Sequence, residues 1–155
     1  MNSVMANRLK ALRGRGDLLV DLAERLPTSV YALMMRGAIF MVFWQSARQK
    51  VDGLLTLKPA TFYLFQYEYA LPLIPSDLAA YVATYCEHVF SVLILIGLAT
   101  RLSAAALLVM TLVIQIFVYP SGWPLHLMWA SILVYLMARG AGRISADRLL
   151  YNSLR

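Results

Sequence analysis

Four apolar stretches alternate with polar connections along the chain, at residues 30–47, 78–98, 102–119 and 123–138. A membrane-spanning helix needs about 20 apolar residues, within a range of about 17 to 25. The second and third stretches reach this length. The first reaches it if its helix continues past Trp44, and the fourth is short unless Arg139 extends its side chain out to the interface. The pattern predicts an all-α, integral membrane bundle of four helices.

Two further segments flank this predicted four-span domain: residues 1–29 before it and a basic tail, residues 139–155, after it. We expect no signal peptide, because the polar stretch before the first apolar run is too long. In the first segment, Asp17 can cap a short helix that Pro27 ends. The residues that share its apolar face are Leu18, Leu19, Leu22 and Leu26. Such a helix would lie in the membrane interface or pack on the end of the bundle.

The predicted connection between the first two spans, residues 49–77, is rich in aromatic residues. So many aromatic side chains in water would form an exposed apolar patch. Phe62, Phe65 and Tyr69 have helical spacing, which predicts a short interfacial helix with these three on one face. The segment could equally fold back over the bundle as a lid, or act as an aromatic plug without a ligand.

Composition and charge support a membrane protein. The chain is 61% hydrophobic and 14% charged, whereas a soluble domain is about a quarter charged. Ten lysines and arginines lie in the two flanking segments and at Arg101, against three, Arg48, Lys50 and Lys58, at the outer end of the first span and in the connection after it. The positive-inside rule then places both termini in the cytoplasm. Because the basic residues bracket apolar stretches and no recognition motif accompanies them, we expect no nucleic-acid binding.

Two residues of opposite charge lie inside the predicted spans: Arg36 in the first and Glu87 in the second. A charged side chain at mid-membrane costs about 2.5 to 3.5 kcal/mol, so such residues are candidates for function. An ion pair would offset that cost. The two differ in depth by about one helical turn, which a long arginine side chain can bridge. We therefore predict a direct Arg36–Glu87 pair, with a purely structural role in locking the register as the alternative.

Other polar residues suggest a ligand pocket near this pair. The candidates are Gln45, Arg48, Lys50, His88, Gln115 and His126. On the first span, the spacing of Arg36, Phe43, Ala47 and Lys50 places them on one stripe. If the stripe faces inward, the pocket would favour an anionic or quinone-like head group. Arg48 and Lys50 could instead extend to lipid phosphates.

A metal site has less support. Cys86, Glu87, His88 and His126 are ligand types that suit copper. The first three are consecutive, and consecutive helical residues point about 100° apart, so they cannot all bind one ion. We therefore predict no metal site and rank copper below quinone. Cys86 is also the sole cysteine, which excludes an intramolecular disulfide.

Two motifs resemble the DoxX family. They are Arg36-Gly37 with Lys50-Val51-Asp52-Gly53, and Glu87 followed by Leu95-Ile96-Gly97-Leu98-Ala99-Thr100-Arg101. The resemblance covers about residues 30–138. It implies a four-helix, multi-pass protein of the bacterial inner membrane, of the kind linked to quinol oxidation, thiosulfate oxidation and oxidative-stress complexes. The positions that carry over are Arg36, Lys50, Glu87, Gly97, Thr100 and Arg101.

The residues and the resemblance together suggest an accessory subunit of a membrane redox system. It would interact with quinone or another lipid-soluble redox partner, with Glu87 exchanging protons. The alternative is a non-enzymatic scaffold or helper for the handling or export of a metal or peptide. A small transporter is a third hypothesis, but no inverted repeat is visible. The expected partners are the lipid bilayer and a second protein or further copies of the chain. Whether the protein is catalytic stays open.

Overall fold

A computed structural model describes residues 26–153 of the protein. Its main helices, in chain order, are α2 (Thr28–Gln49), α4 (Ser76–Ile96), α5 (Thr100–Val113) with its π-helical continuation η2 (Ile114–Val118), α6 (Trp123–Arg139) and α7 (Ala146–Ser153). The fold is all-α apart from one two-stranded hairpin, which confirms the predicted fold class. The amphipathic helix predicted after Asp17 falls almost entirely in residues 1–25, outside the described residues.

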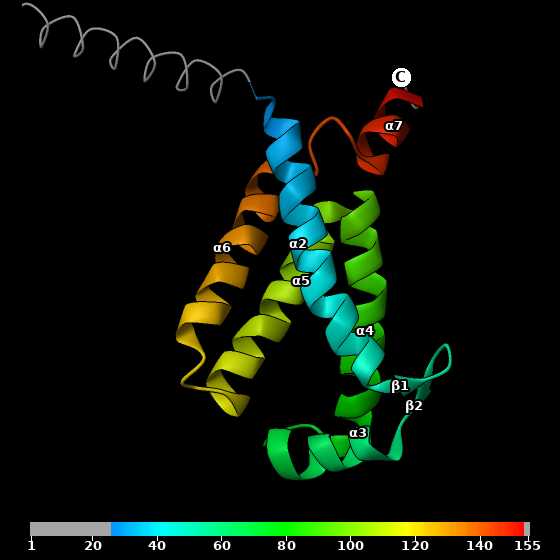
Figure 1. Ribbon diagram of the computed structural model, residues 1–155, viewed down its shortest axis with the longest axis vertical. Coiled ribbons are helices and arrows are strands. Elements are labelled where there is room, and N and C mark those ends of the chain that lie inside the picture. The colour runs from blue at the N-terminus through cyan, green and yellow to red at the C-terminus, as the bar shows by residue number, and fades with distance from the viewer. Residues whose placement is uncertain (1–25, 154–155) are drawn as a thin grey trace, which may run out of the picture.

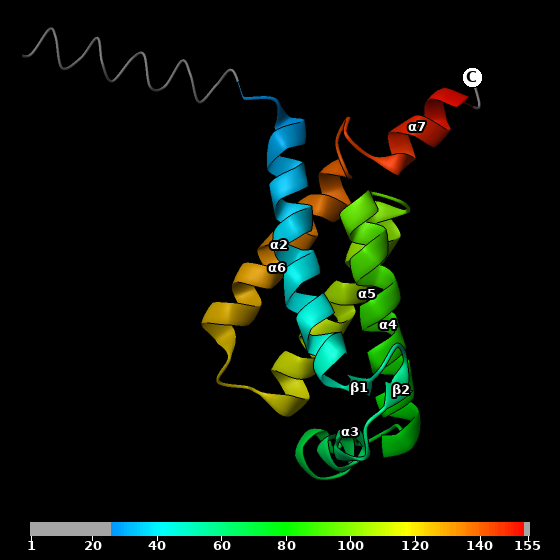
Figure 2. The ribbon, with the colours of Figure 1, turned by 45° about the vertical axis from the view of Figure 1, so that its right-hand side comes forward.

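Four of these helices form the bundle. Helix α2 contacts α4 and α6, and α5 contacts the same two helices, so the four close into a ring (Figures 1 and 2). The centre is apolar; its largest fully buried side chains are Ile39, Phe43, Ile94, Leu107, Leu133 and Leu136. Helices α2, α4 and α5 with η2 are long and apolar enough to cross a membrane. Helix α6 has 17 residues, about 25 Å at 1.5 Å per residue. Its crossing stays a prediction.

Prolines and a glycine set the helix ends. Pro27 and Pro75 are the N-caps of α2 and α4, so both helices begin two residues before the apolar stretches predicted from the sequence. Gly97 ends α4 in the left-handed conformation, with φ of 72°, which glycine adopts without a steric penalty. Helix α5 begins at Thr100. The tight link makes α4 and α5 an antiparallel hairpin.

The long connection, residues 51–75, folds back onto the start of α4. Strands β1 (Val51–Asp52) and β2 (Thr56–Leu57) pair antiparallel, and α3 (Pro59–Tyr63) and η1 (Leu64–Tyr69) follow. Phe65 is buried against α4, and Phe62 and Tyr69 pack on the same cluster. The shared face predicted for these three aromatics is therefore confirmed. The segment packs against α4 and η2, and the choice between an interfacial helix, a lid and a plug stays a prediction.

The start of α2 and the C-terminal helix α7 lie at the opposite end of the bundle from the long connection (Figure 1). The backbone N–H of Arg143 donates a 2.9 Å hydrogen bond to Ser29 Oγ, which joins the tail to α2. The basic tail is therefore docked on the bundle. The side of the membrane on which this end lies stays a prediction.

Candidate functional site

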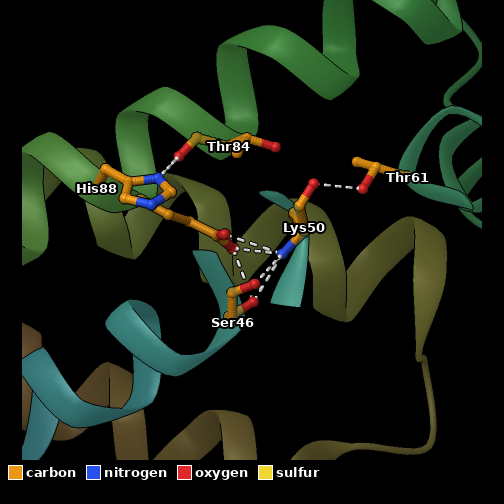
Figure 3. A network of polar contacts seen from close by, with 6 residues as sticks. Ser46, Lys50, Thr61, Thr84 and His88 are labelled. Carbon is orange, nitrogen blue, oxygen red and sulfur yellow. Dashed lines mark hydrogen bonds and ion pairs between the residues drawn. The ribbon is translucent and has the colours of Figure 1, made fainter. Parts of the chain in front are cut away.

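A buried ion pair joins α2 to α4. Lys50 Nζ lies 2.8 Å from Glu87 Oε2 and 3.1 Å from Glu87 Oε1, and the two residues are 6% and 2% exposed. Ser46 links them: its Oγ accepts from Lys50 Nζ at 2.7 Å and donates to Glu87 Oε1 at 3.0 Å (Figure 3). Every oxygen of the carboxylate thus has a donor, which is what makes a buried charge tolerable.

The backbone around Lys50 fixes the ammonium group. Lys50 is the C-cap of α2, where a positive charge interacts favourably with the helix dipole. Its carbonyl oxygen accepts a 2.7 Å bond from Thr61 Oγ1 (Figure 3) and a 3.1 Å bond from the N–H of Lys58. The long connection therefore holds the end of α2, and with it the position of the ammonium group.

The predicted pair between Arg36 and Glu87 is wrong. Helices α2 and α4 run antiparallel in a register that places Arg36 beside Ile94, while Glu87 meets Ser46. Ser46 lies ten residues after Arg36, a rise of about 15 Å along the helix. The offset in depth is therefore too large for an arginine side chain, and Lys50 takes the partner assigned to Arg36.

Arg36 instead binds backbone carbonyls at the other end of the bundle. Its Nε donates to Ile94 O at 2.8 Å, and its Nη2 donates to Leu95 O. Its Nη1 donates to Ala141 O at 3.1 Å and to Ile144 O at 2.6 Å. The guanidinium therefore caps the C-terminal end of α4 and ties the tail to it, a structural role that includes the register-locking alternative.

The inward stripe on α2 is confirmed. Arg36, Phe43, Ala47 and Lys50 are all at most 6% exposed. For this stripe the prediction was wrong in the charged partner of Glu87. Burial follows from helical spacing, whereas pairing depends on the register between helices.

Gln115 and His126 form a second polar pair. Gln115 Nε2 donates to Pro120 O at 2.7 Å, so its Oε1 faces His126 Nδ1, also at 2.7 Å. An amide oxygen only accepts, so Nδ1 of His126 carries the proton and Nε2 of the neutral ring is an acceptor. The π-helical turn η2 brings Gln115 to this position, and π-helical turns occur frequently at functional sites.

The other candidates lie around or outside this region. Gln45 lines the same cavity as Glu87 and His126. Arg48 donates to the carbonyls of Gly53 and Leu54 in the hairpin turn, at 2.6 and 2.8 Å, so it does not form the expected pocket rim.

His88 lies on a neighbouring face of α4. Its Nδ1 donates to Thr84 O at 2.7 Å (Figure 3), and its ring meets Trp44 edge to face. Its Nε2 is buried and has no hydrogen-bond partner among the described residues. It lines neither of the cavities that meet at Glu87.

Two cavities meet at Glu87. The apolar cavity, about 460 Å³, lies between the long connection, α4 and α5 with η2. The polar cavity, about 390 Å³, lies between α2, η2 and α6. Glu87, Tyr69 and Ile114 line both. The rim of the apolar cavity carries exposed apolar side chains, among them Leu78, Val82 and Val109.

The remaining family positions lie at the end of the bundle near Arg36. A Cβ on Gly97 would lie 2.9 Å from Arg36 Cζ and 2.7 Å from Ser145 Cβ, so this position requires glycine. The N–H of Thr100 donates to Asp147 Oδ2 at 3.1 Å. Arg101 is exposed. None of these three residues approaches Glu87.

Two tyrosines close the polar cavity toward the long connection. The hydroxyl of Tyr119 donates to the carboxylate of Glu68, and the Tyr119 ring meets that of Tyr69 edge to face at 6.3 Å. Burial, with the nearby acidic groups adding to it, raises the pKa of Tyr69 to about 12. The bond to Glu68 raises the pKa of Tyr119. Both phenols are therefore protonated donors at neutral pH.

An alkaline titration should detect Tyr69. Its folded-state pKa lies above the value of about 10 for an exposed phenol, so unfolding releases a proton between pH 10 and 12 and stability falls across that window. In phenolate absorbance, Tyr69→Phe should remove a component near pH 12. Tyr67→Phe, at an exposed position on the same segment, should keep it. An unchanged late component in Tyr69→Phe would contradict this environment.

Three residues of this region were not singled out as site residues from the sequence. Ser46 precedes Lys50 by four residues and Trp129 follows His126 by three, and either spacing places two side chains on one helix face. Those spacings were the available signals. Tyr69 was assigned only to an aromatic face; its contact with Tyr119 depends on how the long connection folds, which local spacing does not reveal.

Potential metal ligands are dispersed. Within residues 26–153 no group of three or more His, Cys, Asp or Glu side chains is close enough to hold an ion. Cys86 lines the apolar cavity and His126 the polar one.

Comparisons with known proteins add a family and one relative. The DoxX family model matches residues 31–120, which include most of α2, the long connection, α4 and α5 with η2. A protein of Haemophilus influenzae, described as uncharacterized, is 28% identical over 137 residues, covering 82% of this chain and 87% of its own. No solved structure matches the chain.

Proposed function

The chain belongs to the DoxX family, and from this premise we propose that it is an accessory subunit of a membrane redox system that binds a quinone or similar lipid-soluble redox partner at Glu87. The observation that carries the proposal is the buried Lys50–Glu87 pair at the place where the apolar and polar cavities meet. An ion pair that only stabilised the fold would not need a cavity on either side of it.

The two cavities suit the two parts of such a molecule. The apolar cavity opens between exposed side chains, Leu78, Val82 and Val109, that lie at lipid depth if α4 and α5 span the membrane. A ligand dissolved in lipid could enter there without crossing water. The combined volume is within the usual range of about 300 to 1,000 Å³ for small-molecule sites.

The polar groups fit a head that bears carbonyl or hydroxyl oxygens. Trp129 lines the polar cavity, and its buried indole N–H, which has no partner among the described residues, can donate to a ligand oxygen. His126 Nε2, as an acceptor, can take a hydroxyl proton from the reduced form. A bound quinone would supply two-electron chemistry, and Glu87 would accept or return a proton as Lys50 and Ser46 stabilise its charge.

Quinone binding tests this proposal. We expect purified wild-type protein to bind a short-chain quinone, measured by tryptophan fluorescence quenching in detergent. Glu87→Gln should weaken binding about 10- to 100-fold, since a hydrogen bond to a charged group contributes about 1.5 to 3 kcal/mol. Asp52→Asn, a similar change at a solvent-exposed carboxylate, should leave the affinity unchanged.

A second variant keeps the test informative if Glu87→Gln fails to fold. Ala83→Phe would narrow the apolar cavity while leaving both charged residues of the ion pair in place, and should weaken binding at least tenfold in a folded protein. If wild type and both variants carry equal quinone with equal affinity, Glu87 and its cavities have no part in binding.

One observation favours the alternative of a non-enzymatic scaffold or helper. Tyr63 and Tyr67 stack on each other and are 64% and 72% exposed on the long connection, as expected where aromatic side chains meet a partner protein. A quinone-free protein that co-purifies from native membranes with a stoichiometric partner, and loses it in the Tyr63→Ser, Tyr67→Ser variant, would favour this function.

A further inference from the structure

A second hollow lies at the far end of the bundle from Glu87. It has a volume of about 720 Å³ and lies between the first turns of α2 and α5, the end of α6, and the tail with α7. Residues of four separate elements form its wall, and Figure 2 shows the tail and α7 at the end of the bundle where α2 begins. We call it the basic hollow because four arginines line it: Arg101, Arg139, Arg143 and Arg148.

The charges of the basic hollow are not balanced. Among residues 26–153 the salt bridges are Lys50–Glu87 and Lys58–Asp52, so none involves these arginines. The acidic residue of the wall, Asp147, is already engaged: its carboxylate accepts from the N–H groups of Ala99, at 2.7 Å, and Thr100, at 3.1 Å. Four guanidinium groups around one engaged carboxylate leave a net positive site.

A buried hydroxyl in the same wall also has no partner. Thr100 is 0% exposed and lines the basic hollow, and its Oγ1 has no hydrogen-bond partner among the described residues. Buried hydroxyl groups are normally hydrogen-bonded. A bound oxygen-rich anion would give this group a partner and would neutralise the arginines at the same time.

The position of the basic hollow identifies the kind of anion. It lies where α5 begins and α6 ends, so it is at the level of lipid head groups if these helices cross the membrane. Helix α7 exposes Leu149, Leu150 and Tyr151 beside it, and exposed apolar residues on a short helix at this level suit an interface of lipid. Leu102, on its wall, is 67% exposed and would face acyl chains.

We propose that the basic hollow binds the phosphate of an anionic membrane lipid, with the arginines contacting its oxygens and Thr100 donating from beneath. Arginine suits this role because its planar fork matches phosphate geometry. Basic pockets between helices at the membrane surface are known sites for anionic head groups. This site is separate from Glu87 and does not depend on the function proposed there.

Thermal unfolding in detergent tests the proposal, with phosphatidylglycerol, phosphatidylcholine and inorganic phosphate titrated separately at equal concentrations. Phosphatidylglycerol should raise the unfolding temperature in a saturable way, because a ligand of the folded state stabilises it by mass action. Arg101→Gln with Arg139→Gln should weaken its apparent affinity about 25-fold, from about fivefold for each arginine near a membrane surface. Arg48→Gln with Lys58→Gln removes equal charge at the opposite end of the bundle and should change it less than about twofold.

Three outcomes would overturn the proposal. Equal stabilisation by phosphatidylcholine would show that charge is not recognised, and equal stabilisation by inorganic phosphate would assign the site to a free anion. An equal loss of affinity in the two double variants would show that lipid binding depends on the net charge of the protein and not on the basic hollow. If the variant at the basic hollow fails to fold, the wild-type titrations with the three additives still show whether the site prefers the anionic lipid.

Discussion

Replacement of Lys50 by methionine is expected to lower the free energy of unfolding by about 3 to 5 kcal/mol, because it leaves the carboxylate of Glu87 buried without its counter-charge. Ser46 remains as a donor, but a hydroxyl cannot replace the two contacts of 2.8 and 3.1 Å that the ammonium makes. Unfolding in mixed micelles with increasing SDS measures the change.

The double variant Lys50→Met, Glu87→Met should recover most of this loss, since replacing a buried ion pair with apolar side chains of similar volume is often neutral or stabilising. Lys58→Met is the matched control: its pair with Asp52 is 3.8 Å long and exposed, so the change should cost less than about 1 kcal/mol. A double variant as unstable as Lys50→Met alone would mean that the two residues are not energetically coupled.

Replacement of Arg36 by methionine is expected to be at least as damaging, by about 4 kcal/mol or more. It removes the donors to Ile94, Leu95, Ala141 and Ile144. Ile94 O keeps its 3.1 Å bond from the N–H of Gly97, but a buried carbonyl left without any partner costs about 1 to 3 kcal/mol. Arg36→Lys should restore only part of the loss, because one ammonium cannot reach carbonyls spread over α4 and the tail. The same micelle assay measures both variants.

The coupling between Arg36 and Glu87 distinguishes this arrangement from a direct pair. In the double variant Arg36→Met, Glu87→Met the two losses should add within about 0.5 kcal/mol, as expected for residues without shared partners. A recovery of stability in the double variant relative to Arg36→Met would be evidence for the direct pair that the structure does not contain.

Much of the fold follows from local signals in the sequence. Apolar length and the prolines before α2 and α4 predict the bundle helices to within about two residues, since each signal acts on its own segment. The stripe through Phe43 and Ala47 follows from helical periodicity for the same reason. Even the shared face of Phe62, Phe65 and Tyr69 is a matter of spacing within one short helical segment.

The partners of the buried charges could not be predicted this way. They depend on the register between α2 and α4 and, for Arg36, on carbonyls of the tail 105 and 108 residues away. A backbone carbonyl carries no sequence signal, so a charged side chain is the natural partner to assume. For Lys50, at the end of α2, lipid phosphate was the alternative partner that the sequence offered. The long connection encloses Lys50 only once it has folded, which local spacing does not predict.

The π-helical turn η2 shows a further limit. One wider turn rotates the side chains after Val113 relative to a continuous α-helix. The α-helical period therefore assigns these residues to the wrong face of the helix. Gln115 reaches His126 through this change. The sequence gives both residues as candidates, but it does not predict that they meet.

The carbonyl of Lys50 has a consequence for communication across the protein. Thr61 and Lys58 hold this oxygen from the long connection, while the ammonium of the same residue holds Glu87 in the bundle. One buried residue therefore links the long connection to the interior of the bundle. If a ligand bound in the cavities shifts Lys50, it would also change the affinity of the long connection for a partner protein. Thermodynamic reciprocity would then require the partner to change the affinity for the ligand by the same factor.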